Sequence, residues 1–103
     1  MTQTAPDNHE VRRWRGLPSD RLLRESWDEA SLVYHRESGE THLLGPLADQ
    51  ALLLLQEAPM SLDQLAERLA ALCETEADVH WRQRIETLVA ELAALELVES
   101  ADP

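Results

Sequence analysis

The sequence predicts one domain of the α+β class, in which three short antiparallel strands are followed by three helices. Two observations support this prediction. Short runs of β-branched and aromatic residues separated by turns occupy the first half of the chain, whereas Leu- and Ala-rich segments with helical spacing occupy the second half. Strands confined to one end of a chain favour an α+β fold over alternating strands and helices. A length of 103 residues corresponds to a single domain.

The three strands are expected at residues 21–27, 31–35 and 41–44. The second of them contains the β-branched and aromatic side chains that are typical of strands. Gly39, in the turn that follows it, can adopt a positive φ, so the second and third strands should pair antiparallel across a tight turn. If the strands pair in chain order, the third strand lies at an edge of the sheet. Three strands of this length must pack on helices to be stable.

Three helices are expected from Pro46 onward, because the missing N–H of proline is harmless at the first helical position. The first, over residues 46–58, is apolar on most sides and should be the buried one. Ser61 and Gln64 have the spacing of a capping box that opens the second helix. The third should run over about residues 79–97 with an apolar stripe along one side.

The segments outside the domain are expected to be tails. Residues 1–13 are polar and lack periodicity, which predicts a disordered N-terminal tail, and residues 100–103 form a short C-terminal tail. The domain should therefore occupy residues 14–99. Trp14 follows the N-terminal tail and could dock on the body of the domain.

The charge of the chain is strongly negative and unevenly distributed. Residues 1–45 hold six Arg and eight Asp or Glu, residues 46–103 hold three Arg and twelve Asp or Glu, and the net charge is −11. Duplex DNA and anionic membranes attract clustered positive charge, so this composition disfavours both as partners. No membrane-spanning stretch or signal sequence is recognised, which predicts a cytoplasmic location. Cys73, the only cysteine, is expected as a small core residue.

An ordered series of motifs over residues 32–98 resembles the PqqD-like peptide chaperones, also known as RiPP recognition elements. The series consists of a hairpin, a strand that runs directly into a Leu-rich helix, a Ser-capped helix and a last helix with an apolar end. Its members are Val33-Tyr34-His35 with Ser38-Gly39-Glu40, then Thr41-His42-Leu43-Leu44-Gly45-Pro46-Leu47-Ala48, Ser61-Leu62-Asp63-Gln64-Leu65-Ala66 and Leu92-Ala93-Ala94-Leu95-Glu96-Leu97-Val98. The lead-in at Trp14, Trp27-Asp28 and residues 41–44 are most similar to the HPr-rel-A system branch of this family.

The resemblance implies a winged helix-turn-helix fold and a non-catalytic role in peptide recognition. Family members bind the leader segment of a precursor peptide as a further strand on the third strand, beside the last helix, and a modifying enzyme is brought to the peptide. For the HPr-rel-A branch, that companion would be an HPr-kinase-related ATPase. Residues 56–59 lack the Asp-Gly that members with a known peptide often carry there, so the resemblance implies no particular peptide.

The predicted peptide-binding site joins the third strand to the exposed border of the last helix. Strand addition requires unpaired backbone groups, no proline within the edge and a neighbouring apolar groove. Pro46 lies beyond the end of the third strand, so the second condition is met. An acidic helical half would favour a peptide with Lys or Arg. Alternation places Thr41 with Leu43 on one face and His42 with Leu44 on the other. The predicted site residues are Thr41, His42, Leu43, Leu44, Trp81, Arg84, Ile85 and Leu88.

Other interpretations of these residues stay open. Leu43 and Leu44 also suit a core, and Trp81 also suits a packing anchor. His35 and His42 could face each other across the hairpin, but two imidazoles do not form a zinc site, so no metal and no other cofactor is predicted. The sequence contains no phosphate-binding loop and no nucleophile motif, so no enzymatic activity is expected. Two rival functions remain, a winged-helix DNA-binding regulator and a structural adaptor or homodimer that uses the same sheet edge.

Overall fold

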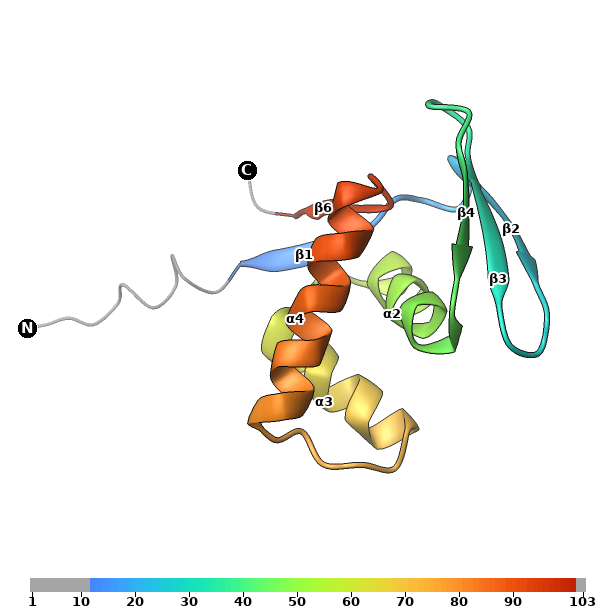
Figure 1. Ribbon diagram of the computed structural model, residues 1–103. Helices are drawn as coiled ribbons and strands as arrows, with labels where there is room; N and C mark the ends of the chain where they lie inside the picture. Colours follow the sequence, from blue (N-terminus) through green and yellow to red (C-terminus); the bar gives the residue numbers. More distant parts are fainter. Residues whose placement is uncertain (1–11, 102–103) are drawn as a thin grey trace, which may run out of the picture.

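The structure is a computed structural model that describes residues 12–101 (Figure 1). The tail predicted at residues 1–13 therefore lies outside the described residues except for its last two. Within the described residues, six strands form two three-stranded sheets, and three helices complete the fold. In chain order, the elements are β1 (Arg13–Gly16), β2 (Leu22–Ser26), β3 (Ser31–His35), β4 (Thr41–Leu44), α2 (Pro46–Glu57), β5 (Met60–Ser61), α3 (Leu62–Leu72), α4 (Val79–Ala94) and β6 (Val98–Ser100).

The first sheet is the three-stranded meander that the sequence predicts. β2, β3 and β4 pair antiparallel in chain order, so β4 forms one edge and β2 forms the other. Val33 and Leu44 on the inner face are buried, whereas Tyr34 and Leu43 on the outer face are exposed. This sheet precedes the three helices in the chain, so the α+β prediction is confirmed.

The second sheet joins the two ends of the described chain and was not predicted. β1 lies between β5 and β6 and is antiparallel to both, with Trp14 opposite Met60 on one side and Ser100 on the other. The lead-in segment therefore docks as a strand. β1 begins at Arg13 and β6 ends at Ser100, so each strand extends one residue beyond the predicted domain limits of 14–99.

β1 is also fixed to α2 and to the end of α4. The side-chain amide of Gln56 donates a hydrogen bond to the carbonyl oxygen of Leu17 at 2.8 Å, and the Leu17 N–H donates to the Leu97 carbonyl at 3.0 Å. Gly16 permits this close approach, because a Cβ there would lie 2.8 Å from Cγ of Gln56. A larger residue at this position would displace the side chain that anchors the strand.

The three helices begin at residues that cap or initiate them. Pro46 occupies the first turn of α2, as predicted. At the start of α3, Ser61 Oγ accepts from the Gln64 N–H at 3.1 Å and Gln64 Oε1 accepts from the Ser61 N–H at 3.0 Å. The predicted capping box is therefore confirmed. α4 begins after Asp78, whose carboxylate accepts from the Trp81 N–H at 2.9 Å.

The core lies among α2, α3, α4 and the inner face of the first sheet (Figure 1). Its buried side chains are almost entirely aliphatic, and Trp14 and Trp81 are partly buried against them. The helix predicted to be buried, α2, contributes Leu52 and Leu55 to its centre. No helix within residues 12–101 is long and apolar enough to span a bilayer.

Candidate functional site

The backbone groups of Thr41 and Leu43 point away from β3, toward the open edge of the sheet. In an antiparallel pair, alternate residues direct both their N–H and their C=O toward the partner strand. The His35 N–H donates to the Glu40 carbonyl at 2.8 Å, so Glu40 and the even-numbered residues after it face β3. The odd-numbered residues of β4 therefore hold the unpaired groups of this edge.

The pairing of β2 with β3 leads to the same assignment. The Trp27 N–H donates to the Ala30 carbonyl at 2.7 Å, and the Arg36 N–H donates to the Arg21 carbonyl at 3.1 Å. With the observed register, the even-numbered residues of β3 then bond to β2 and its odd-numbered residues bond to β4. Val33 is one of these odd-numbered residues, and its partner on β4 is His42. His42 is thus tied to β3, and its neighbours on β4 remain open.

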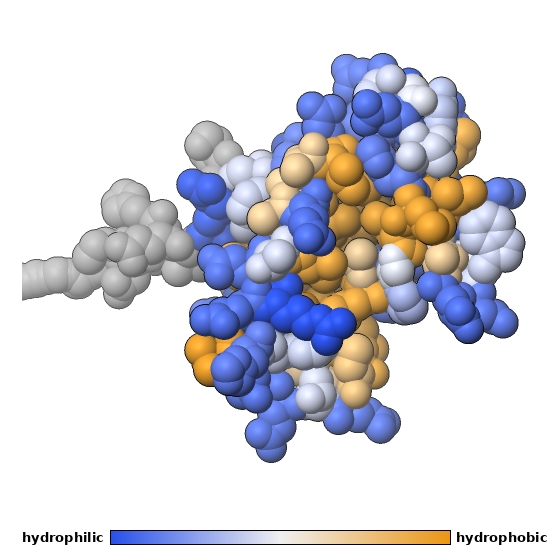
Figure 2. Space-filling view, in the orientation of Figure 1, coloured by the Kyte–Doolittle hydropathy of each residue, from blue (hydrophilic) through white to orange (hydrophobic). Residues whose placement is uncertain are grey.

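An apolar groove runs beside this edge, between β4 and α4. It has a volume of about 630 Å³ and is closed at its base by the first turn of α2. In Figure 2, apolar side chains gather in the hollow between α4 and the first sheet, and hydrophilic residues surround them. We refer to this hollow as the β4 groove. The residues that line it are Leu43, Leu44, Gly45, Pro46, Leu47, Ala48, Arg84, Thr87, Leu88, Glu91, Leu92 and Leu95.

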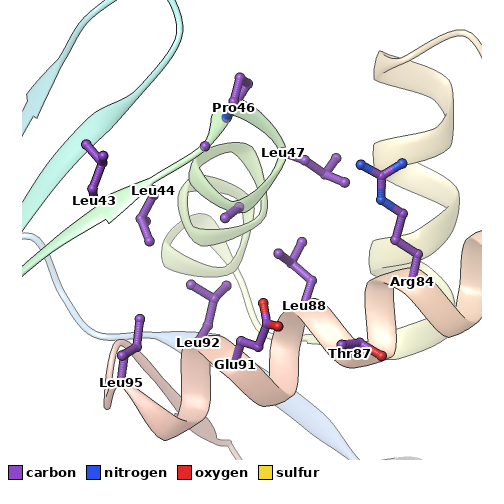
Figure 3. Close-up of a pocket in the computed structure, with 12 residues that line it drawn as sticks. Leu43, Leu44, Pro46, Leu47, Arg84, Thr87, Leu88, Glu91, Leu92 and Leu95 are labelled. Carbon is purple, nitrogen blue, oxygen red and sulfur yellow. The ribbon is translucent and has the colours of Figure 1, made fainter.

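The floor of the β4 groove is aliphatic, and charged groups stand on its helical side. Leu44, Leu88 and Leu92 are directed into the space between the strand and the helix (Figure 3). Arg84 and Glu91, two turns apart on α4, also line it. The groove can therefore accept apolar side chains in its floor and contact charged ones of either sign along α4.

The structure brings half of the predicted site residues together in the β4 groove. Leu43, Leu44, Arg84 and Leu88 line it, although Leu44 is only 4% exposed and also belongs to the core. Leu43 is 68% exposed, so the alternative of a plain core residue is wrong for it. Thr41 lies on the same strand, and its side chain is exposed.

The other predicted site residues lie outside the β4 groove. Ile85 is fully buried in the core, because its position on α4 faces the other helices and not the strand edge. Trp81 is an anchor between helices, since its indole N–H donates to the Ala66 carbonyl on α3 at 2.8 Å. The His42 side chain points inward, is 14% exposed, and has its Nε2 3.5 Å from a carboxylate oxygen of Glu40. That separation is too long for a strong hydrogen bond.

Several groove residues were not predicted as site residues. Thr87, Glu91 and Leu95 continue the row that begins at Arg84 and Leu88, at spacings of three and four residues. That spacing was available in the sequence as a signal. The prediction instead included Trp81 and Ile85, which lie outside the β4 groove.

The structure also settles the histidine and cysteine positions. His35 is buried opposite Glu40 and not opposite His42, and its Nδ1 accepts from the Ser38 N–H at 3.2 Å. Cys73 is exposed at the end of α3, so the prediction of a core cysteine is wrong. Within residues 12–101, no three His, Cys, Asp or Glu side chains are grouped closely enough to hold a metal ion.

Comparisons with known proteins support the fold. No protein-family model and no curated protein sequence matches the chain. Among solved structures, it is similar to TbiB1 in complex with the TbiA(beta) leader peptide, with a TM-score of 0.65 and 17% sequence identity. The match covers 84% of this chain and 98% of the TbiB1 chain. The predicted α+β fold of the PqqD-like winged-helix type is therefore confirmed.

Proposed function

We propose that this chain is a non-catalytic module that binds a peptide along β4 and presents it to a modifying enzyme. The observation that carries the proposal is the open edge of β4 directly beside a Leu-lined groove. An incoming extended segment would satisfy the N–H and C=O groups of Thr41 and Leu43. Backbone hydrogen bonds of this kind supply affinity for many sequences, and side-chain pockets supply the selection.

The side chains of such a peptide would alternate between two surroundings. Every second residue would enter the β4 groove against Leu44 and Leu88, and the residues between them would lie beside Leu43 on the outer face. We infer that the preferred segment has apolar residues at alternate positions. A net charge of −11 would favour Lys or Arg at the remaining positions and accelerate the encounter.

Two further lines support a peptide as the ligand. TbiB1, which shares the fold, was solved with a leader peptide bound. The motifs of residues 32–98 resemble a family that binds leader segments of precursor peptides. On this basis the partners are a leader or precursor peptide, or a peptide segment of another protein, and a companion enzyme. By resemblance to the HPr-rel-A branch, that enzyme is an HPr-kinase-related ATPase, and the complex forms in the cytoplasm.

Amide hydrogen exchange on the chain tests the proposal. Peptides would first be selected from a displayed random library and then added to the isotope-labelled protein. In the free protein, the Thr41 and Leu43 amides should exchange rapidly and the His42 and Leu44 amides slowly. At a peptide concentration of about 100 Kd, exchange at the first two should slow by about a hundredfold. Peptides that bind while both amides still exchange rapidly would contradict strand addition.

The two rival functions predict different measurements. A DNA-binding regulator would bind random duplex DNA with an affinity that falls steeply with salt. We expect no such binding, because α4 offers Arg82 and Arg84 together with Glu86 and Glu91, and Arg82 is already paired with Asp63. A homodimer through β4 would protect the same amides without peptide, and its mass would depend on protein concentration.

A further inference from the structure

A second apolar pocket lies next to the β4 groove, on the side of α3. Its volume is about 410 Å³, within the range of about 300–1,000 Å³ that is typical of ligand sites. Leu69, Leu72 and Cys73 at the end of α3 form one wall, and Trp81 of α4 forms another. We refer to it as the α3 pocket.

The α3 pocket and the β4 groove share a boundary. Pro46, Leu47 and Arg84 line both of them. In Figure 3, Leu47 and Arg84 point toward each other across this boundary. The guanidinium carbon of Arg84 lies 5.8 Å from the centre of the Trp81 ring, which orients the arginine along the wall of the pocket. A chain that leaves the β4 groove past Leu47 therefore meets the α3 pocket next.

The chemistry of the α3 pocket fits an apolar side chain. Its walls are mainly aliphatic and aromatic, and no Asp or Glu is among the residues that line it. Leu72 is 58% exposed in this wall, so apolar surface there would be removed from water by an occupant. Gln50 and Thr75 contribute neutral polar groups, and Arg84, at the boundary with the β4 groove, contributes a positive charge.

We infer that the α3 pocket holds a large apolar side chain of the same peptide that pairs with β4. This inference rests on the proposed function. The pocket lies beyond the carboxyl end of β4, where the strand turns into α2 at Pro46. All pairs in the first sheet are antiparallel, and an antiparallel peptide would place this anchor residue on the amino-terminal side of its paired segment. The ligand is therefore a peptide with an aromatic or large aliphatic residue upstream of its alternating segment.

Cys73 permits a test that needs no peptide. It is the only cysteine in the sequence, it is exposed, and it lines the α3 pocket. The protein would be equilibrated with 2-phenylethanethiol disulfide or with 2-hydroxyethanethiol disulfide, and the adducts would be measured by intact mass. The phenylethyl adduct should be favoured by about tenfold over the hydroxyethyl adduct. In a control protein with Cys73→Ser and Arg68→Cys, which moves the thiol to an exposed face of α3, this preference should vanish. Equal preference at the two positions would overturn the inference.

A peptide measurement separates this inference from the proposed function. A selected peptide would be made in two forms, with Phe or with Ser at the upstream anchor position. Leu72→Asp should weaken binding of the Phe form by about tenfold and leave the Ser form unchanged. Val79→Asp, the same change at an exposed position outside both cavities, should affect neither form. If the unaltered protein binds both forms equally well, the inferred anchor in the α3 pocket is refuted, and the proposed function is not. If selection from the library yields no peptide that binds the protein, both the proposed function and the inference that rests on it are refuted.

Discussion

Arg24 on β2 binds both carboxylate oxygens of Asp49 on α2. Its Nε donates to Oδ1 at 2.9 Å and its Nη2 donates to Oδ2. The two side chains are only 26% and 11% exposed, so water competes weakly for these hydrogen bonds. Two parallel hydrogen bonds between the planar guanidinium and carboxylate groups also fix the orientation of one side chain relative to the other. It therefore holds the first sheet at a set angle on the helix that forms the base of the β4 groove.

Removal of this ion pair should destabilise the protein. Asp49→Ala would leave the Arg24 guanidinium partly buried without its carboxylate, and we expect a loss of about 2 kcal/mol in the free energy of unfolding. Glu37→Ala is the matched control, because it removes an exposed carboxylate that pairs with Arg21. That change should cost less than about 0.5 kcal/mol. Urea unfolding of both variants measures the difference, and equal losses would contradict the structural role of the pair.

Leu43→Pro should strongly weaken peptide binding and leave the fold intact. The Leu43 N–H faces the open edge, so proline removes a donor that β3 does not use. His42→Pro is the control, because the His42 N–H faces β3 and its loss should unfold the hairpin. Circular dichroism should distinguish the two variants, and peptide affinity of the Leu43→Pro protein should fall by about tenfold or more. If both variants unfold alike, the assignment of open and paired residues on β4 is wrong.

Arg84→Glu should change peptide affinity without changing stability. The side chain is exposed and lines the β4 groove, so reversing its charge alters the potential along the peptide path. A basic peptide should bind about fivefold more tightly at low salt, and the gain should shrink at high salt. Arg68→Glu makes the same charge change on an exposed face of α3, outside both cavities, and should have a smaller effect. Peptide titrations measure both affinities. If the two changes alter the affinity equally, the peptide does not bind in the β4 groove.

Glycine should stabilise the ends of α3 and α4. Glu74 and Glu96 follow these helices with φ of 56° and 63°, a left-handed conformation that costs a side-chain-bearing residue about 1 kcal/mol. After α4, the Leu97 N–H donates to the Leu92 carbonyl at 3.0 Å, which is the pattern of a helix end that usually contains glycine. Glu96→Gly should therefore raise the free energy of unfolding by about 0.5–1 kcal/mol. Glu91→Gly, in the interior of α4, should lower it by a similar amount.

The first sheet, the three helices and the order of the elements were predictable because local signals agree with one another. Gly39 marks a turn with φ of 78°, and Ser61 with Gln64 marks the start of α3 by direct hydrogen bonds. The second sheet was not predictable in this way. Its central strand holds two arginines and pairs with residues about 45 and 85 positions later, so no pattern within a short window reveals it.

The site was predicted in part for a related reason. The strand edge follows from chain order, and residues 41–44 are where the sequence places them. The helical side depends on the rotation of α4 about its axis. Ile85 and Val89 pack in the core. The rotation of α4 that buries them directs Arg84, Leu88 and Glu91 toward β4. A broad apolar stripe allows several such rotations, and only packing selects among them.

β1 and β6 pair side by side, and the hydrogen bond from the Ala101 N–H to the Arg13 carbonyl, at 2.8 Å, holds the start of β1 next to the end of β6, across the molecule from β4 (Figure 1). A short linker could join these neighbouring ends and yield a circularly permuted chain opened in the exposed loop between α3 and α4. Because these ends lie far from β4, a fusion partner or a surface tether attached to either of them would leave the edge of β4 accessible to a ligand.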